Sequence, residues 1–125
     1  MVDILIAEDE PAILESLNFI LGRCGWSVDS VHDGDAAIEA VRRLRPGMLL
    51  LDIMLPKRSG LDVLKAIRSD AFLKHVPVLI LTARGQQYDR QIAAELKADG
   101  FVTKPYANND VIQEVRRLLG SPAQG

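Results

Sequence analysis

Five side chains suited to ionic or covalent chemistry stand directly after short apolar runs of the sequence. They are Glu8, Asp9, Asp52, Thr82 and Lys104. Three are carboxylates, which repel one another when they converge and which bind a hard divalent cation such as Mg²⁺ (or Mn²⁺) through their oxygens. The hydroxyl of Thr82 and the ammonium of Lys104 are groups that contact anionic oxygens. Together the five side chains are suited to handling a phosphoryl group.

Asp52 has the strongest case for a direct part in that chemistry. An aspartate can act as a nucleophile and become an aspartyl phosphate, while a metal ion neutralises charge in the loose transition state. Each residue alone has a simpler explanation: Asp9 could cap a helix, Thr82 suits any strand, and Asp52 could belong to a turn. A lone lysine such as Lys104 is usually solvated surface. The hypothesis therefore depends on all of them falling at corresponding places in the fold.

Apolar periodicity predicts the elements that must position these side chains. Strands are expected at 3–7, 26–31, 48–51, 77–81 and 101–103, and helices at 10–23, 33–44, 61–68, 86–97 and 108–119. Strands and helices alternate five times, which predicts an α/β fold with a (βα)5 doubly wound, five-stranded parallel sheet and helices on both faces. Ligands of such sheets bind beyond the carboxyl ends of the strands, so the five candidate side chains are expected to converge there.

The composition is that of a single globular domain. The chain has 125 residues, 48% of them hydrophobic, with a formal net charge of −2, which argues against direct nucleic-acid binding. Cys24 is the one cysteine, so no internal disulfide can form, and the apolar runs are too short for a membrane span. We expect a cytoplasmic protein, with a domain at 1–120 and a flexible tail or truncated linker at 121–125.

Five motifs in order resemble the receiver domains of bacterial two-component response regulators. They are Ile6–Pro11 (IAEDEP), Leu51–Pro56 (LDIMLP), Ser59-Gly60, Leu81–Arg84 (LTAR) and Gly100–Tyr106 (GFVTKPY). The motif text looks most like receivers of the winged-helix DNA-binding subclass, but without the effector domain of that subclass we expect either a single-domain regulator or an excised receiver of a larger regulator. The resemblance covers the chain up to its tail and implies a flavodoxin-like sheet of order 2-1-3-4-5.

The resemblance also implies a role for each matching residue. Asp52 would be the phosphoacceptor, and Thr82 and Lys104 would contact the phosphoryl oxygens. The metal ligands would be Glu8, Asp9, Asp52 and the backbone carbonyl of Met54, with Asp9 the more direct of the acidic pair.

The resemblance further implies a role for Phe101 and a conformation for the Lys104–Pro105 peptide bond. Phe101 stands where the family places a switch aromatic, so Thr82 and Phe101 would together form the switch. The Lys104–Pro105 peptide bond is expected to be cis, which proline permits.

The implied function is a phosphorylation-activated signalling switch rather than an enzyme with turnover on a separate substrate. The donor would be a phosphohistidine of a histidine kinase or phosphotransfer protein. The output would be a change in the surface formed by 86–97, 101–103 and 108–119, acting on a downstream protein partner or a missing effector domain. We expect a monomer or a phosphorylation-dependent homodimer. Gly100 replaces an aspartate that belongs to an ion-pair network across the dimer of the winged-helix subclass, which puts that dimer in doubt.

The sequence also bears on three other functions. A phosphatase with an aspartate nucleophile generally needs a second aspartate where this chain has Met54. A nucleotide- or flavin-binding domain would need a Gly-rich phosphate loop, and Glu8–Pro11 stands there instead. A receiver-like domain that binds partners without phosphorylation remains an alternative. In either case the candidate docking surfaces are the exposed side of the helix expected at 10–23, around Leu14 and Asn18, and the turn after Lys104. The lack of a carboxylate or amide at Met54 and Arg84 predicts slow loss of a bound phosphoryl group.

Overall fold

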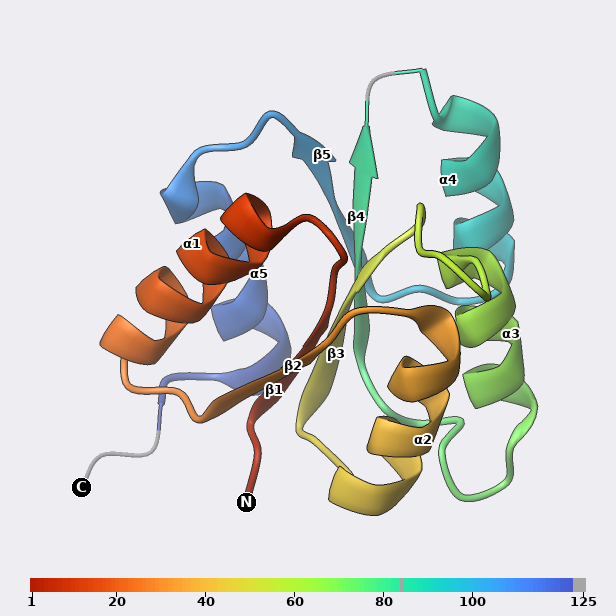
Figure 1. Ribbon diagram of the computed structural model, residues 1–125, viewed down its shortest axis with the longest axis horizontal. Coiled ribbons are helices and arrows are strands. Elements are labelled where there is room, and N and C mark those ends of the chain that lie inside the picture. Colours follow the sequence, from red (N-terminus) through yellow and green to blue (C-terminus); the bar gives the residue numbers. More distant parts are fainter. Residues whose placement is uncertain (84, 123–125) are drawn as a thin grey trace.

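The computed structural model describes residues 1–83 and 85–122, in which five strands and five helices alternate (Figure 1). The strands are β1 (Ile4–Ala7), β2 (Val28–Val31), β3 (Met48–Asp52), β4 (Val78–Ala83) and β5 (Gly100–Lys104). The helices are α1 (Pro11–Arg23), α2 (Gly34–Leu44), α3 (Gly60–Ser69), α4 (Gln87–Glu95) and α5 (Asn108–Leu119). The predicted number, type and order of elements are therefore confirmed.

All strands are parallel, and their order in the sheet is β2-β1-β3-β4-β5, as predicted. Helices α1 and α5 cover one face of the sheet, and α2, α3 and α4 cover the other (Figure 1). Strand order reverses between β1 and β3, because the chain first adds β2 on one side and then adds β3, β4 and β5 on the other. In such sheets the crevice at this reversal is where ligands bind.

The hydrophobic core lies in two layers, one on each face of the sheet. Strand β1 sends Leu5 and Ala7 into the layer under α2, α3 and α4, and Ile4 and Ile6 into the layer under α1 and α5. Because both faces are covered, β1 and β3 are buried along their lengths, and they are apolar throughout except for Asp52 at the end of β3. The candidate carboxylates Glu8 and Asp52 therefore stand at the carboxyl ends of two strands that are packed on both faces.

Several boundaries differ from the predicted ones. Strand β2 begins at Val28, and Trp26 before it is buried in the apolar layer under α1 and α5. Strands β3, β4 and β5 extend to include Asp52, Thr82 and Lys104, which were expected just after them. The ladder continues through these residues because Asp52 pairs with Leu81 and Thr82 with Thr103.

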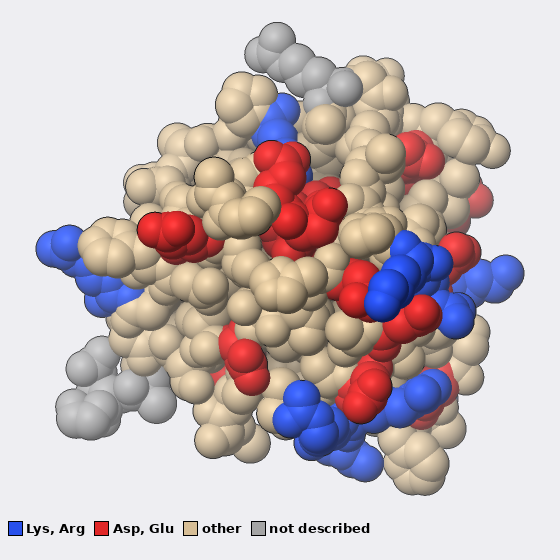
Figure 2. Space-filling view, viewed as in Figure 1, with Lys and Arg blue, Asp and Glu red and all other residues tan. Residues whose placement is uncertain are grey.

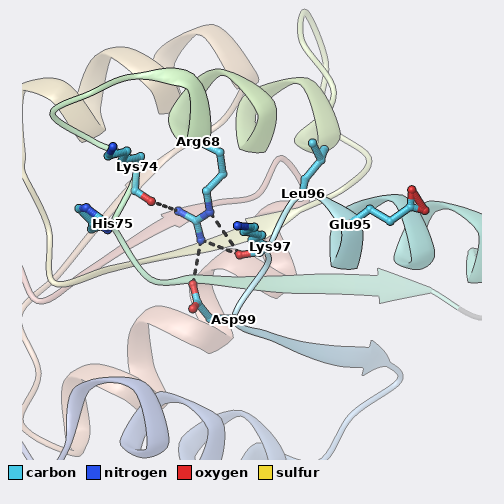
Figure 3. Close-up of a pocket in the computed structure, with 7 residues that line it drawn as sticks. All are labelled: Arg68, Lys74, His75, Glu95, Leu96, Lys97 and Asp99. Atoms are coloured by element: carbon cyan, nitrogen blue, oxygen red, sulfur yellow. Dashed lines mark hydrogen bonds and ion pairs between the residues drawn. The ribbon is translucent and has the colours of Figure 1, made fainter.

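Arg68 at the end of α3 joins three segments at the amino ends of β4 and β5 (Figure 3). Its guanidinium donates hydrogen bonds to the carbonyl oxygens of Lys74, Val76 and Lys97 and to Asp99 Oδ2, at 2.7–3.2 Å. The side chain is only 14% exposed. The guanidinium of Arg68 has five N–H groups that can donate hydrogen bonds. They provide hydrogen-bond donors to loop carbonyls that would otherwise lack a partner.

The described residues contain no helix that combines the length and apolar character needed to span a membrane.

We predict that Arg68→Lys lowers the free energy of unfolding by about 1–3 kcal/mol, because an ammonium cannot reproduce the planar array of donors. Urea denaturation measures the change. Arg58→Lys is the matched control, since Arg58 is an exposed arginine paired with Asp35 at 2.9 Å and should change stability by less than about 0.5 kcal/mol. Equal effects of the two substitutions would show that Arg68 is an ordinary surface arginine.

Candidate functional site

Three acidic side chains meet at the carboxyl ends of β1 and β3. Ala7 pairs with Leu51 in the ladder, so Glu8 and Asp52 follow side by side, and Asp9 comes next along the chain. One carboxylate oxygen from each lies within 4.8 Å of the others. Glu8 is fully buried and Asp52 is 4% exposed, whereas Asp9 is exposed. Figure 2 shows acidic side chains gathered over this edge of the sheet, with a basic one beside them.

Lys104 reaches the two buried carboxylates from the end of β5. Its Nζ donates hydrogen bonds to Glu8 Oε1 and to Asp52 Oδ2, each at 3.1 Å. The Lys104–Pro105 peptide bond is cis, as expected. One ammonium thus serves two carboxylates, and the site keeps an excess of negative charge when all three acids are ionised.

The backbone around Asp52 fixes the direction of its carboxylate. Asp52 Oδ1 accepts a hydrogen bond from the Met54 N–H at 3.0 Å, and the Gly60 N–H donates to the Ile53 carbonyl at 2.8 Å. A Cβ at Gly60 would clash with the carbonyl oxygen of Asp52, so only glycine allows α3 to begin this close to the strand. Met54 itself is exposed. The loop thereby leaves the Asp52 carboxylate pointing into the crevice.

The electrostatics of the site follow from burial and charge. Burial, aided by the neighbouring Asp52 carboxylate, raises the pKa of Glu8 to about 7, although the Glu10 N–H and Lys104 act against the rise. Burial alone would lower the pKa of Lys104, but Asp52 and Glu8 outweigh it and raise that pKa. The ionised form of Glu8 is therefore destabilised, whereas the protonated, charged form of Lys104 is stabilised.

The donor set fits a hard divalent cation. Three carboxylates offer only oxygen ligands, and the raised pKa of Glu8 marks a surplus of negative charge that a cation would relieve. Oxygen-rich sites with few protein ligands suit Mg²⁺ or Mn²⁺ more than Zn²⁺, which prefers nitrogen and sulfur.

The two predicted switch residues lie on β4 and β5, the strands that follow β3 in the sheet. Thr82 is 2% exposed, and its Oγ1 lies 3.2 Å from Thr103 Oγ1. Phe101 is half-buried, and the Arg90 guanidinium lies 4.7 Å from its ring centroid. Sequence reasoning missed both Thr103 and Arg90. Thr103 had a usable signal, because Thr82 and Thr103 each stand one residue before the end of a strand, and those strands are neighbours.

A cavity of about 390 Å³ opens beside Thr82, between the end of β4, the start of α4 and β5. Its lining residues are Thr82, Ala83, Gly85, Gln86, Gln87, Arg90 and Thr103. Arg84, one of the two positions expected to govern phosphoryl lifetime, lies outside the described residues. Leu14, suggested as a docking residue, is buried in the layer under α1 and α5, so that suggestion was wrong.

Comparisons with known proteins agree with this geometry. A family model described as "Response regulator receiver domain" matches residues 4–116. The probable transcriptional regulatory protein TcrX of Mycobacterium tuberculosis is 41% identical over 118 residues, which is 94% of this chain and 50% of TcrX. The chain spans about half the length of the curated relatives it matches.

Solved structures share the fold. A putative response regulator from Chloroflexus aurantiacus superimposes with a TM-score of 0.89 at 26% identity, covering 94% of this chain and 97% of that one. The receiver domain of sensor histidine kinase PA1611 from Pseudomonas aeruginosa gives a TM-score of 0.87 at 28% identity, covering 96% and 98%. That structure holds a magnesium ion coordinated in its active-site cleft.

The fold and the acidic crevice define a signalling module of the two-component type. The chain belongs to the response regulator receiver domain family.

Glu8 should make the stability of the metal-free protein depend on pH. A carboxyl with a folded-state pKa of about 7 and an ordinary value of 4.5 favours folding below pH 4.5, and this contribution is lost as the pH rises through 7. We predict that Glu8→Gln stabilises the metal-free protein at pH 8 by about 1–3 kcal/mol and changes little at pH 4.5. Urea denaturation at both pH values, in the presence of a chelator, measures this.

The control for this measurement is Glu39→Gln, at an exposed acid on α2. If both variants show the same pH dependence as the wild type, Glu8 is not the group responsible, and the electrostatic description of the site is wrong.

Proposed function

We propose that the chain is a phosphorylation-activated switch in which Asp52 accepts a phosphoryl group from a phosphohistidine of a histidine kinase or phosphotransfer protein. One observation carries the proposal: the buried Asp52 carboxylate is held by the Met54 N–H on one oxygen and by Lys104 on the other, beside two further acids. A carboxylate oriented in this way is placed to act as a nucleophile.

In the reaction an Asp52 oxygen forms a bond to phosphorus while the bond from phosphorus to the donor imidazole nitrogen breaks. The imidazole keeps the electron pair of that bond and takes up a proton. Lys104, whose pKa is raised, stays protonated and offers its charge to the phosphoryl oxygens. The donor protein supplies the group, and the chain modifies itself, so it does not turn over a separate substrate.

A metal ion completes the proposed site. Glu8, Asp9, Asp52 and the Met54 carbonyl would hold Mg²⁺ (or Mn²⁺), with Asp9, the exposed member, as the more direct ligand of the acidic pair. When bound, the ion supplies neutralisation of charge on the transferring group. The oxygen-only donor set and the magnesium in the cleft of the Pseudomonas receiver support this assignment.

Phosphorylation adds nearly two negative charges and three acceptor oxygens beside Thr82. Thr82 would turn toward them, and Phe101 would then repack on the face formed by α4, β5 and α5. Phe101 has no hydroxyl, so its position depends on packing and on the Arg90 guanidinium above its ring. A coupling of about 1–3 kcal/mol is enough to shift such a population.

The output of the switch is proposed to be a downstream protein partner or an effector domain of a longer protein. Relatives such as the probable transcriptional regulatory protein TcrX are about twice as long as this chain. On β5, the space above Gly100 is filled by Arg117 and Glu114, which pair with each other at 2.9 Å. The pairing of Arg117 with Glu114 within the chain is a further argument against a dimer held by ion pairs of an acid at position 100. Monomer and phosphorylation-dependent homodimer both remain predictions.

Incubation with acetyl phosphate, followed by intact mass measurement, tests the proposal. We predict a gain of one phosphoryl group that requires both Mg²⁺ and Asp52, so that Asp52→Asn gains none. Asp29→Asn, at an exposed aspartate on β2, should gain it as the wild type does. If no group is gained while magnesium binding is shown separately, the chain is a phosphorylation-independent binding module.

The lifetime of the phosphoryl group gives a further prediction. Met54 is exposed beside the site and offers no group to orient an attacking water, so the phosphorylated protein should persist well beyond seconds without a phosphatase. Met54→Asn should shorten the lifetime by about tenfold or more, because its amide can position that water. The loss of radiolabel over time measures both, and wild-type loss within seconds would contradict the prediction.

A further inference from the structure

The Thr82 hydroxyl has a specific partner in the unphosphorylated protein. Thr82 and Thr103 pair in the β4–β5 ladder, and their Oγ1 atoms lie 3.2 Å apart. Within the described residues, this is the one hydrogen bond that the Thr82 side chain makes. The hydroxyl therefore contacts β5, whereas Lys104 holds Asp52.

We propose that Thr103 is a positioning residue that holds the Thr82 hydroxyl away from the phosphoryl site until phosphorylation releases it. This inference rests on the proposed function, since it concerns the regulation of the same site. The threshold of the switch is then set by a competition between the Thr103 hydroxyl and the phosphoryl oxygens for Thr82.

The hydroxyls of Thr82 and Thr103 differ in burial. Loss of the hydrogen bond between them therefore has a different free-energy cost for each hydroxyl. Thr82 is buried, so its hydroxyl loses a hydrogen bond outright when Thr103 is absent. Thr103 is exposed, so after release its own hydroxyl can bond to water at little cost. Removing the Thr103 hydroxyl therefore penalises the resting state much more than the activated state.

The surroundings of Thr82 give its side chain room to move and connect it to the face formed by α4, β5 and α5. The cavity of about 390 Å³ beside Thr82 is lined by Thr103 and by Arg90 of α4. Phe101 lies two residues before Thr103, on the same face of β5, with Arg90 over its ring. A change in the Thr82–Thr103 bond thus occurs on the strand that carries the proposed switch aromatic.

The test is the affinity of the protein for beryllofluoride, a tetrahedral mimic of a phosphoryl group, at saturating Mg²⁺. Titration followed by NMR gives the dissociation constant. The peak positions of the Phe101 and Val102 amides give the resting population of the activated form. The variants are Thr103→Val, the isosteric variant without a hydroxyl, and Thr103→Ser, which keeps the hydroxyl. Each is also made in a Thr82→Ala background.

We expect Thr103→Val to bind beryllofluoride about three- to tenfold more tightly than wild type and to move the resting peaks toward their bound positions. Thr103→Ser should match wild type. In the Thr82→Ala background, Thr103→Val should have no further effect, because no hydroxyl is left to release.

Two results would overturn the inference while leaving the proposed function intact: wild type binds the mimic and Thr103→Val binds no more tightly, or the gain persists in the Thr82→Ala background. Failure of the wild type to bind beryllofluoride with Mg²⁺ present would overturn both the inference and the proposed function.

Discussion

The site depends on one electrostatic constraint: two buried carboxylates, Glu8 and Asp52, share a single ammonium. Their neighbouring positions follow from the pairing of β1 with β3, which places the residues after Ala7 and Leu51 side by side. Burial and mutual repulsion raise the pKa of Glu8 to about 7. A site with this surplus of negative charge favours a cation.

The residues at the amino ends of the strands and those at the carboxyl ends have different roles. At the amino ends of β4 and β5, the donors of Arg68 are matched by loop carbonyls and Asp99, an arrangement that stabilises the fold. At the carboxyl ends, burial and the Asp52 carboxylate raise the pKa of Glu8, and Thr82 Oγ1 lies 3.2 Å from Thr103 Oγ1. Functional sites commonly retain such locally unfavourable interactions, which the packed layers on both faces of the sheet can support.

Much of the fold could be predicted from the sequence, because the apolar runs and their alternation with amphipathic segments are strong signals. Strand ends were less predictable: β3 and β4 continue through Asp52 and Thr82, since ladder pairing with a neighbour extends a strand past its apolar run. The meeting of Glu8, Asp9, Asp52 and Lys104 could be predicted from their positions after the strands, while the roles of these residues and of Thr82 stay predictions. The Thr82–Thr103 bond and the placement of Arg90 over Phe101 could not be predicted, because both depend on register and side-chain direction.

The proposed switch requires that Asp52 itself carries the phosphoryl group. The most direct measurement is reduction of the phosphorylated protein with borohydride, which converts an aspartyl phosphate to homoserine, followed by mass spectrometry of its peptides. If Asp52 is the acceptor, homoserine will appear at position 52, and only when Mg²⁺ was present during phosphorylation. Homoserine at Asp9 or elsewhere, or a phosphorylated protein that yields no homoserine, would contradict it.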